Sequence, residues 1–117
     1  MDEAELMQRL LDSSGAIIYL KDDHGRILLV NRGFLDFFKK SKDQIIGKTD
    51  HALGTDEQVK AWRANDLKAT ESGKPYSFEE TASGAEGTRT FMSYKFPVHG
   101  IEGAPKAVGG ISVPLTN

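Results

Sequence analysis

The chain has 117 residues, enough for one domain at roughly 100–200 residues per domain, and its 38% of apolar residues can form a core, which excludes global disorder. The net charge is −2 and no basic run is longer than Lys39-Lys40, which argues against a nucleic-acid partner. The absence of cysteine excludes disulfide scaffolds, cysteine-type zinc sites, iron–sulfur clusters, thiol nucleophiles and cysteinyl cofactor adducts.

The first half of the chain predicts a helix, a hairpin and a second helix. Residues 3–13 carry an apolar stripe at helical spacing, with acidic residues in the first turn. Strands over 16–21 and 26–30 flank a tight turn that ends in glycine, which predicts a β-hairpin. A short helix over 32–39 follows, and the side chain of Asn31 can cap its first turn.

The second half of the chain predicts a longer helix and three strands. A helical turn over 41–47 precedes an irregular stretch, and a helix over 55–72 then begins with a capping box and ends at a glycine. Strands over 76–82, 88–98 and 106–115 are separated by glycine-bearing turns.

This order predicts an α+β fold. It combines a five-stranded antiparallel sheet with short helices and one longer helix on one face, plus an N-terminal helix. We divide the chain into that helix, 1–14, and a single domain over 15–117.

Nothing in the sequence indicates a secreted or membrane protein. The longest apolar runs, 16–20 and 27–30, are far shorter than the ~20 residues of a membrane helix. The N-terminus is acidic and lacks the basic region of a secretory signal. We therefore expect a cytoplasmic location and no direct membrane contact.

Several short motifs, none of them specific alone, are informative through their joint order and spacing. They are Ala16–Ile27, Val30–Phe34, Ile45–Lys48, Trp62–Asp66, Ser72–Pro75, Lys95–Val98 and Gly109–Ser112. Together they resemble a PAS domain, of the subgroup found in bacterial sensor histidine kinases and diguanylate cyclases. The resemblance covers nearly the whole chain.

The resemblance implies a signal-sensing module of a larger bacterial protein, as in two-component systems. Such a module binds a small molecule noncovalently between sheet and helices and relays to an output domain, either a kinase or a cyclic-di-GMP enzyme. The module itself is expected not to be an enzyme. The residues that line the ligand space in the family's fold correspond here to Phe34, Phe37, Ile45, Trp62, Phe78, Met92, Tyr94 and Ile111.

Two alternatives stay open. One is a ligand-free PAS module for dimerisation or protein interaction, with a packed core. The other is a sensor that uses haem or noncovalent flavin, although we expect no cofactor and no metal otherwise. Among the three histidines only His51, before the long helix, is a candidate axial ligand for haem.

The N-terminal helix carries the clearest sign of a partner. Its stripe consists of Leu6, Met7, Leu10 and Leu11. It predicts a homodimer through this helix and the sheet face, while the competing interpretation is that the stripe only covers its own sheet.

The sequence contains no signature of catalysis. It lacks a phosphate-binding loop and a nucleophile elbow. The pair Glu79-Glu80 would point to opposite faces of a strand, so the two carboxylates cannot share a substrate. We expect an inward Glu80 to pair with Arg89 or Lys95 on the neighbouring strand in preference to orienting a polar ligand.

Overall fold

The computed structural model describes residues 1–115, so residues 116 and 117 of the predicted domain lie outside the described part. The α+β class and each predicted element are confirmed. In chain order the elements are α1 (Glu3–Ser13), β1 (Ile17–Lys21), β2 (Ile27–Val30), α2 (Arg32–Phe38), α3 (Lys42–Ile45), the 3-10 helix η1 (Asp50–Ala52), α4 (Asp56–Ser72), β3 (Tyr76–Gly84), β4 (Gly87–Val98) and β5 (Ala107–Pro114).

The ends of α4 follow the local chemistry of the sequence. Thr55 and Gln58 form the predicted capping box, each side chain bonding to the other's backbone N–H. At the other end Gly73 adopts the left-handed conformation, φ 72°, which glycine tolerates without a Cβ clash. The long helix therefore has fixed limits on both sides.

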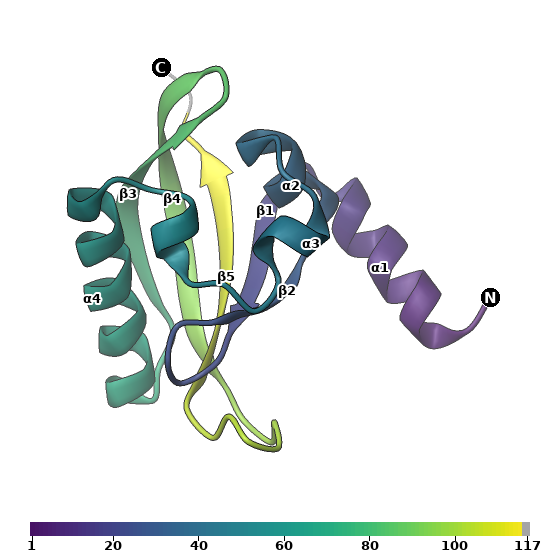
Figure 1. Ribbon diagram of the computed structural model, residues 1–117. Helices are drawn as coiled ribbons and strands as arrows, with labels where there is room; N and C mark the ends of the chain where they lie inside the picture. Colours follow the sequence, from purple (N-terminus) through teal and green to yellow (C-terminus); the bar gives the residue numbers. More distant parts are fainter. Residues whose placement is uncertain (116–117) are drawn as a thin grey trace.

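The sheet is antiparallel throughout, in the order β2-β1-β5-β4-β3. The helices α2, α3, η1 and α4 all lie on one of its faces, as Figure 1 shows. On this inner face the ring of Tyr19 lies directly over Gly110, its partner on β5, where any Cβ would clash with the ring Cζ. Only glycine leaves room for the Tyr19 ring at this position.

The register of β4 decides which residues face the helices. Phe91, Ser93 and Lys95 point inward and are at most 3% exposed. The alternate residues Met92 and Tyr94 point outward. The prediction that these two residues and Ile111 line the space between sheet and helices was therefore wrong, because Tyr94 and Ile111 are paired on the outer face.

The side of α4 that faces the sheet repeats at helical spacing. Its buried residues are Val59, Trp62, Asp66 and Ala69. Leu67 is 38% exposed, because it lies one position away from the buried stripe. The helix thus presents one buried carboxylate and one buried indole to the sheet.

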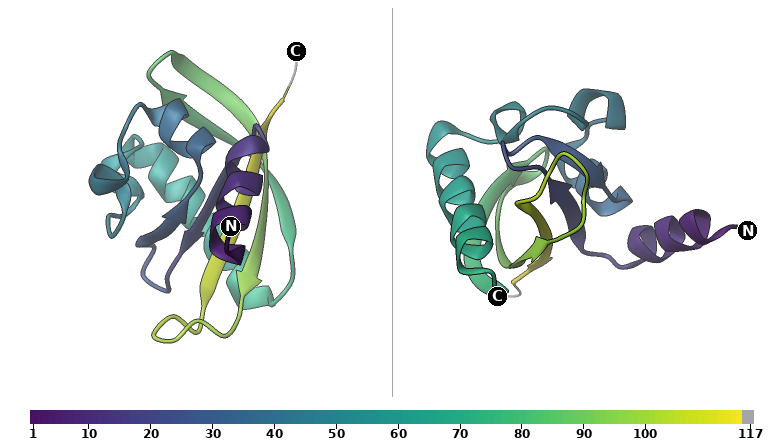
Figure 2. Two further views of the ribbon diagram at one scale, coloured as in Figure 1. Left: turned by 90° about the vertical axis from the view of Figure 1, so that its right-hand side faces the viewer. Right: turned by 90° about the horizontal axis from the view of Figure 1, so that it is seen from below.

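The N-terminal helix α1 projects away from the rest of the fold, as Figure 1 and the right-hand view of Figure 2 show. Two contacts attach its last turn to the domain. Asp12 Oδ1 accepts from the N–H of Arg32 at 2.7 Å, and the Nδ2 of the buried Asn31 donates to Leu11 O at 2.8 Å and to Ala16 O at 2.9 Å. The Oδ1 of Asn31 accepts from the N–H groups of Ile18 and Phe34. One side chain therefore joins the end of α1, the start of β1 and the start of α2.

Among residues 1–115, no helix is both long enough and apolar enough to cross a membrane.

Candidate functional site

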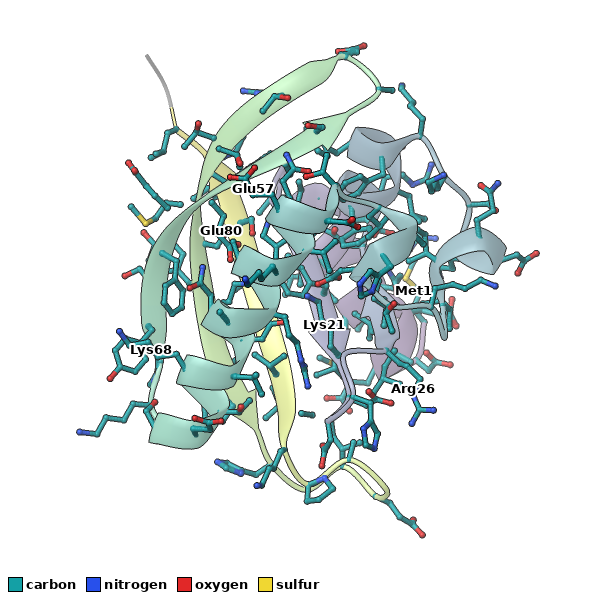
Figure 3. All side chains as sticks on the ribbon, turned by 60° about the vertical axis from the view of Figure 1, so that its left-hand side comes forward. Met1, Lys21, Arg26, Glu57, Lys68 and Glu80 are labelled. Atoms are coloured by element: carbon teal, nitrogen blue, oxygen red, sulfur yellow. The ribbon has the colours of Figure 1, made fainter. Side chains whose placement is uncertain are left out.

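Charged side chains from several different elements meet between the sheet and the helices. They are Lys21 on β1, Asp50 on η1, Asp66 on α4, Glu80 on β3 and Lys95 on β4. Every one of these side chains is at most 9% exposed. Figure 3 shows Lys21 and Glu80 within this layer. We call these five residues the buried charge network.

The carboxylate of Asp66 lies at the centre of the network. Its Oδ2 is 2.9 Å from Lys21 Nζ and its Oδ1 is 2.7 Å from Lys95 Nζ. Lys21 also contacts Asp50 Oδ2 at 2.6 Å, and Lys95 contacts Glu80 Oε2 at 2.9 Å. Each lysine thus lies between two carboxylates, which compensates the cost of taking its charge out of water.

Neutral groups complete the contacts around the network. The Tyr19 ring lies beside both lysines, with its centroid 5.0 Å from Lys21 Nζ and 5.6 Å from Lys95 Nζ. The amide of Asn65 donates to Glu80 Oε2 at 3.0 Å. The face of the aromatic ring therefore serves as a further partner for the two ammonium groups.

The pKa values within the network follow from opposing effects of burial and charge. Burial raises the pKa of a carboxyl, yet Lys21 and Lys95 outweigh it and hold the pKa of Asp66 below its ordinary value. Burial likewise lowers the pKa of a lysine, but Asp66 and Asp50 more than offset it at Lys21 and leave that pKa raised. The pKa of Lys95 is also raised, since Tyr19, Asp66 and Glu80 outweigh its burial. Both lysines and Asp66 are charged at neutral pH.

A small cavity adjoins the network on the inner face of the sheet. Its volume is ≈ 50 Å³. The lining residues are Ile17, Tyr19, Lys21, Phe34, Phe38, Asp50, Leu53, Trp62, Glu80, Ala82, Phe91, Ser93, Lys95 and Ser112. The wall therefore combines four charged side chains with five aromatic ones.

The structure brings only part of the predicted ligand-lining set to this cavity. Phe34 and Trp62 line it. Phe37 packs against Phe91 in the core, and Ile45 is fully buried there, but neither lines the cavity. Phe78 stacks on its neighbour Tyr76 on β3, away from the cavity.

The sequence did not predict the buried charge network as a group, although it predicted one of its pairs. The predicted pairing of Glu80 with Lys95 is confirmed at 2.9 Å. Lys21 gave a usable signal, because it alternates with Ile17 and Tyr19 and so must share their buried face. Asp50 gave none, since its stretch has no periodicity.

The residues present do not fit a haem or flavin group. The cavity is about a third of the ~150 Å³ that accommodates benzene in an engineered protein, far below the size of either cofactor. His51 is exposed, and its Nδ1 lies 3.2 Å from Thr49 Oγ1 rather than at the cavity. His51 therefore does not serve as an axial ligand in this arrangement. Within residues 1–115 no cluster of three or more His, Asp or Glu side chains is arranged to hold a metal ion.

Asp66→Asn should be strongly destabilising, because it removes the carboxylate that both buried lysines share. We expect a loss of about 3–5 kcal/mol in the free energy of unfolding, measured by urea denaturation with the fluorescence of Trp62. Glu71→Gln, an exposed change on the same helix, should leave it nearly unaltered. If both variants unfold at the wild-type urea concentration, the network does not stabilise the fold.

The network also predicts how stability depends on pH. Asp66 has a lowered pKa in the folded chain, so its contribution is present above the ordinary value of 3.8 and is lost as pH falls below it. Lys21 and Lys95 have raised pKa values, so their contribution is present below 10.5 and is lost at higher pH. Urea denaturation should give a constant free energy of unfolding between about pH 5 and pH 9. A steep fall between pH 5 and pH 7 would show that another group controls stability.

Known proteins share the fold described above. The family described as PAS fold matches residues 11–117. The virulence sensor protein BvgS of Bordetella pertussis is 42% identical over 48 residues, which make up 41% of this chain and 4% of that protein. The structure of the BvgS PAS domain matches with a TM-score of 0.75 at 25% identity, covering 100% of this chain and 89% of that chain.

Two further relatives come from other signalling proteins. A diguanylate cyclase of Vibrio cholerae is 26% identical over 115 residues, which make up 96% of this chain and 36% of that protein. The chain therefore spans only a minor part of the length of the curated relatives it matches. The PAS domain of the quorum-sensing receptor RpfR from Cronobacter turicensis, in complex with BDSF, has a TM-score of 0.75 at 19% identity and shows the shared fold. The match covers 89% of this chain and 97% of the RpfR PAS chain. Because the family match extends over almost the whole sequence, this chain belongs to the PAS fold family.

Proposed function

We propose that this PAS domain is the sensory module of a larger bacterial signalling protein. It binds a small molecule noncovalently in the cavity beside the buried charge network, and it relays occupancy to an output domain. A kinase or a cyclic-di-GMP enzyme is the output that its relatives suggest. The division of the chain at residue 15 and a cytoplasmic location stay predictions.

The observation that carries this proposal is the position of the cavity against the network. Ligand contacts with Lys21, Asp50, Glu80 or Lys95 would act on β1, η1, β3 and β4 together, because these residues line the cavity and are ion-paired to one another or to Asp66. A ligand changes the output only if its affinity differs between two arrangements of these elements. One molecule bound beside the network would contact residues of several elements, and the relative arrangement of these elements is what such a change alters.

A screen of low-mass compounds by thermal denaturation tests whether the cavity binds a ligand. Ala82→Val adds two methyl groups at the cavity wall, while the control Ala61→Leu enlarges an exposed residue of α4. A ligand at ten times its Kd stabilises the fold by about 1.4 kcal/mol. We expect at least one compound to raise the Tm of the wild type and of Ala61→Leu but not of Ala82→Val.

Two results of this screen would contradict ligand sensing. One is that no compound raises the Tm of the wild type. The other is that the same compounds raise the Tm of Ala82→Val equally, which would place binding outside the cavity.

Dimerisation is a second function that a specific observation favours. Leu6, Met7 and Leu10 on α1 are 55%, 55% and 72% exposed, and the helix projects from the domain instead of covering the sheet (Figure 2). The outer face of the sheet adds further exposed apolar area, including Tyr94 at 48% and Val113 at 36%. We propose that a second copy of the chain covers these surfaces across a two-fold axis.

Leu10→Glu should convert a dimer to a monomer, because it places a charge in the middle of the stripe that the partner would bury. Light scattering coupled to size exclusion measures the mass. Leu67→Glu on α4, where the leucine is 38% exposed, is the control that should remain dimeric. A wild-type chain that is monomeric at tens of micromolar would contradict the proposal.

A further inference from the structure

We propose that the cavity selects a small ammonium compound, of about the size of ethylammonium, and rejects anions. This ligand class rests on the proposed function, since it specifies what the cavity binds. The reasons lie in the hydrogen-bonding capacity, the charge and the size of the site.

Each lysine of the network already contacts two carboxylates and lies beside the Tyr19 ring. An ammonium group carries three N–H donors. Lys21 uses two of them on Asp50 and Asp66, and its Nζ lies over the Tyr19 ring. Lys95 bonds to Asp66 and Glu80 and contacts the same ring. At most one N–H of each ammonium remains for an anion, and an anion bound there would lie beside the carboxylates that contact the same lysine.

The polar atoms at the cavity include two carboxylate oxygens that lack a donor, besides the hydroxyl groups of Tyr19, Ser93 and Ser112, which can both donate and accept. Asp50 binds Lys21 through Oδ2, and Glu80 binds Lys95 and Asn65 through Oε2. Asp50 Oδ1 and Glu80 Oε1 accept no hydrogen bond from any side chain within residues 1–115. Both side chains line the cavity and are only 9% and 7% exposed. No fully enclosed side-chain oxygen or nitrogen among residues 1–115 lacks a partner, so these two oxygens face open space.

The charge of the site points the same way. Three carboxylates and two ammonium groups give the network a formal charge of −1. A cation in the cavity would neutralise this excess, whereas an anion would double it. The rest of the wall includes the aromatic rings of Tyr19, Phe34, Phe38, Trp62 and Phe91, and ring faces attract ammonium ions.

The size of the cavity limits the ligand to a few atoms. One water needs roughly 10–15 Å³ and benzene is held by about 150 Å³ on the same measure. The observed ≈ 50 Å³ therefore accommodates about two to four non-hydrogen atoms. Methylammonium and ethylammonium have this size, and each supplies three N–H donors to the carboxylate oxygens.

Titration with ethylammonium chloride tests this assignment, with sodium acetate as the anion, ethanol as the neutral molecule and sodium chloride as the salt control. Trp62 is the only tryptophan of the chain and lines the cavity, so its fluorescence reports binding. We expect a saturable change with ethylammonium alone, with a Kd on the order of 1 mM because so small a ligand makes few contacts.

The adjacent glutamates of β3 provide matched variants. Glu80→Gln removes the charged acceptor at the cavity and should weaken ethylammonium binding by about tenfold or more. Glu79→Gln changes the same residue type on the exposed side of the strand and should bind like the wild type. Ala82→Val, which leaves every charge in place, should abolish binding and serves if Glu80→Gln does not fold.

Several outcomes would overturn the inference, and they differ in what they mean for ligand sensing. Saturation with acetate or equal saturation with ethanol would show that the cavity does not select ammonium, although it still binds a ligand. Wild-type affinity in Glu80→Gln would show that the network charge is not recognised. An absence of saturation with all three probes would overturn the ammonium assignment, while the wider compound screen would decide separately whether the cavity binds anything.

Discussion

The shared carboxylate of Asp66 is the constraint on which the rest of the inner layer depends. Two lysines on strands at either side of β5 are buried, and each is tolerated because Asp66 lies between them. Asp50 and Glu80 then occupy the remaining sides of the lysines. The arrangement requires α4 to lie across the sheet with Asp66 facing it, and η1 to turn its acidic residue inward. The placement of α4 and η1 is therefore tied to the pairing of the buried charges.

The two faces of the sheet have different characters as a result. The inner face is closed by helices and holds the network, the aromatic residues and the small cavity. The outer face presents half-exposed apolar residues, and α1 departs from the edge of the fold with its stripe uncovered. Asn31 connects the two regions, because it is buried in the inner core and also holds the last turn of α1. Asn31 thus bonds both to the backbone of Phe34 in the core and to the last turn of the N-terminal helix.

The order and limits of the elements could be predicted from the sequence because capping residues, glycines and apolar spacing mark them locally. The face that each β4 residue occupies could not, since Phe91 and Lys95 alternate with Met92 and Phe96, and both sets contain apolar residues. The resemblance assigned Met92 and Tyr94 to the ligand space, whereas the register of β4 turns both to the outer face. Lysine is seldom buried, so its presence on the inner face becomes understandable only when Asp66 and Glu80 are seen beside it. Such pairing joins residues distant in the sequence, which periodicity does not report.

The alternation of lysine with apolar neighbours also bears on how the chain avoids misfolded sheets. A slip of β1 by one residue would turn Lys21 to the outside and bring Leu20 to face Asp66. The same slip in β4 would replace Lys95 by Phe96 or Tyr94. In either case a carboxylate would be buried without its counterion, which is among the more costly errors a folded chain can make. Apolar residues on both sides of a strand leave the correct alignment poorly distinguished from its neighbours. The buried ions supply the missing distinction, because a misaligned sheet would leave Asp50 or Glu80 buried without its lysine.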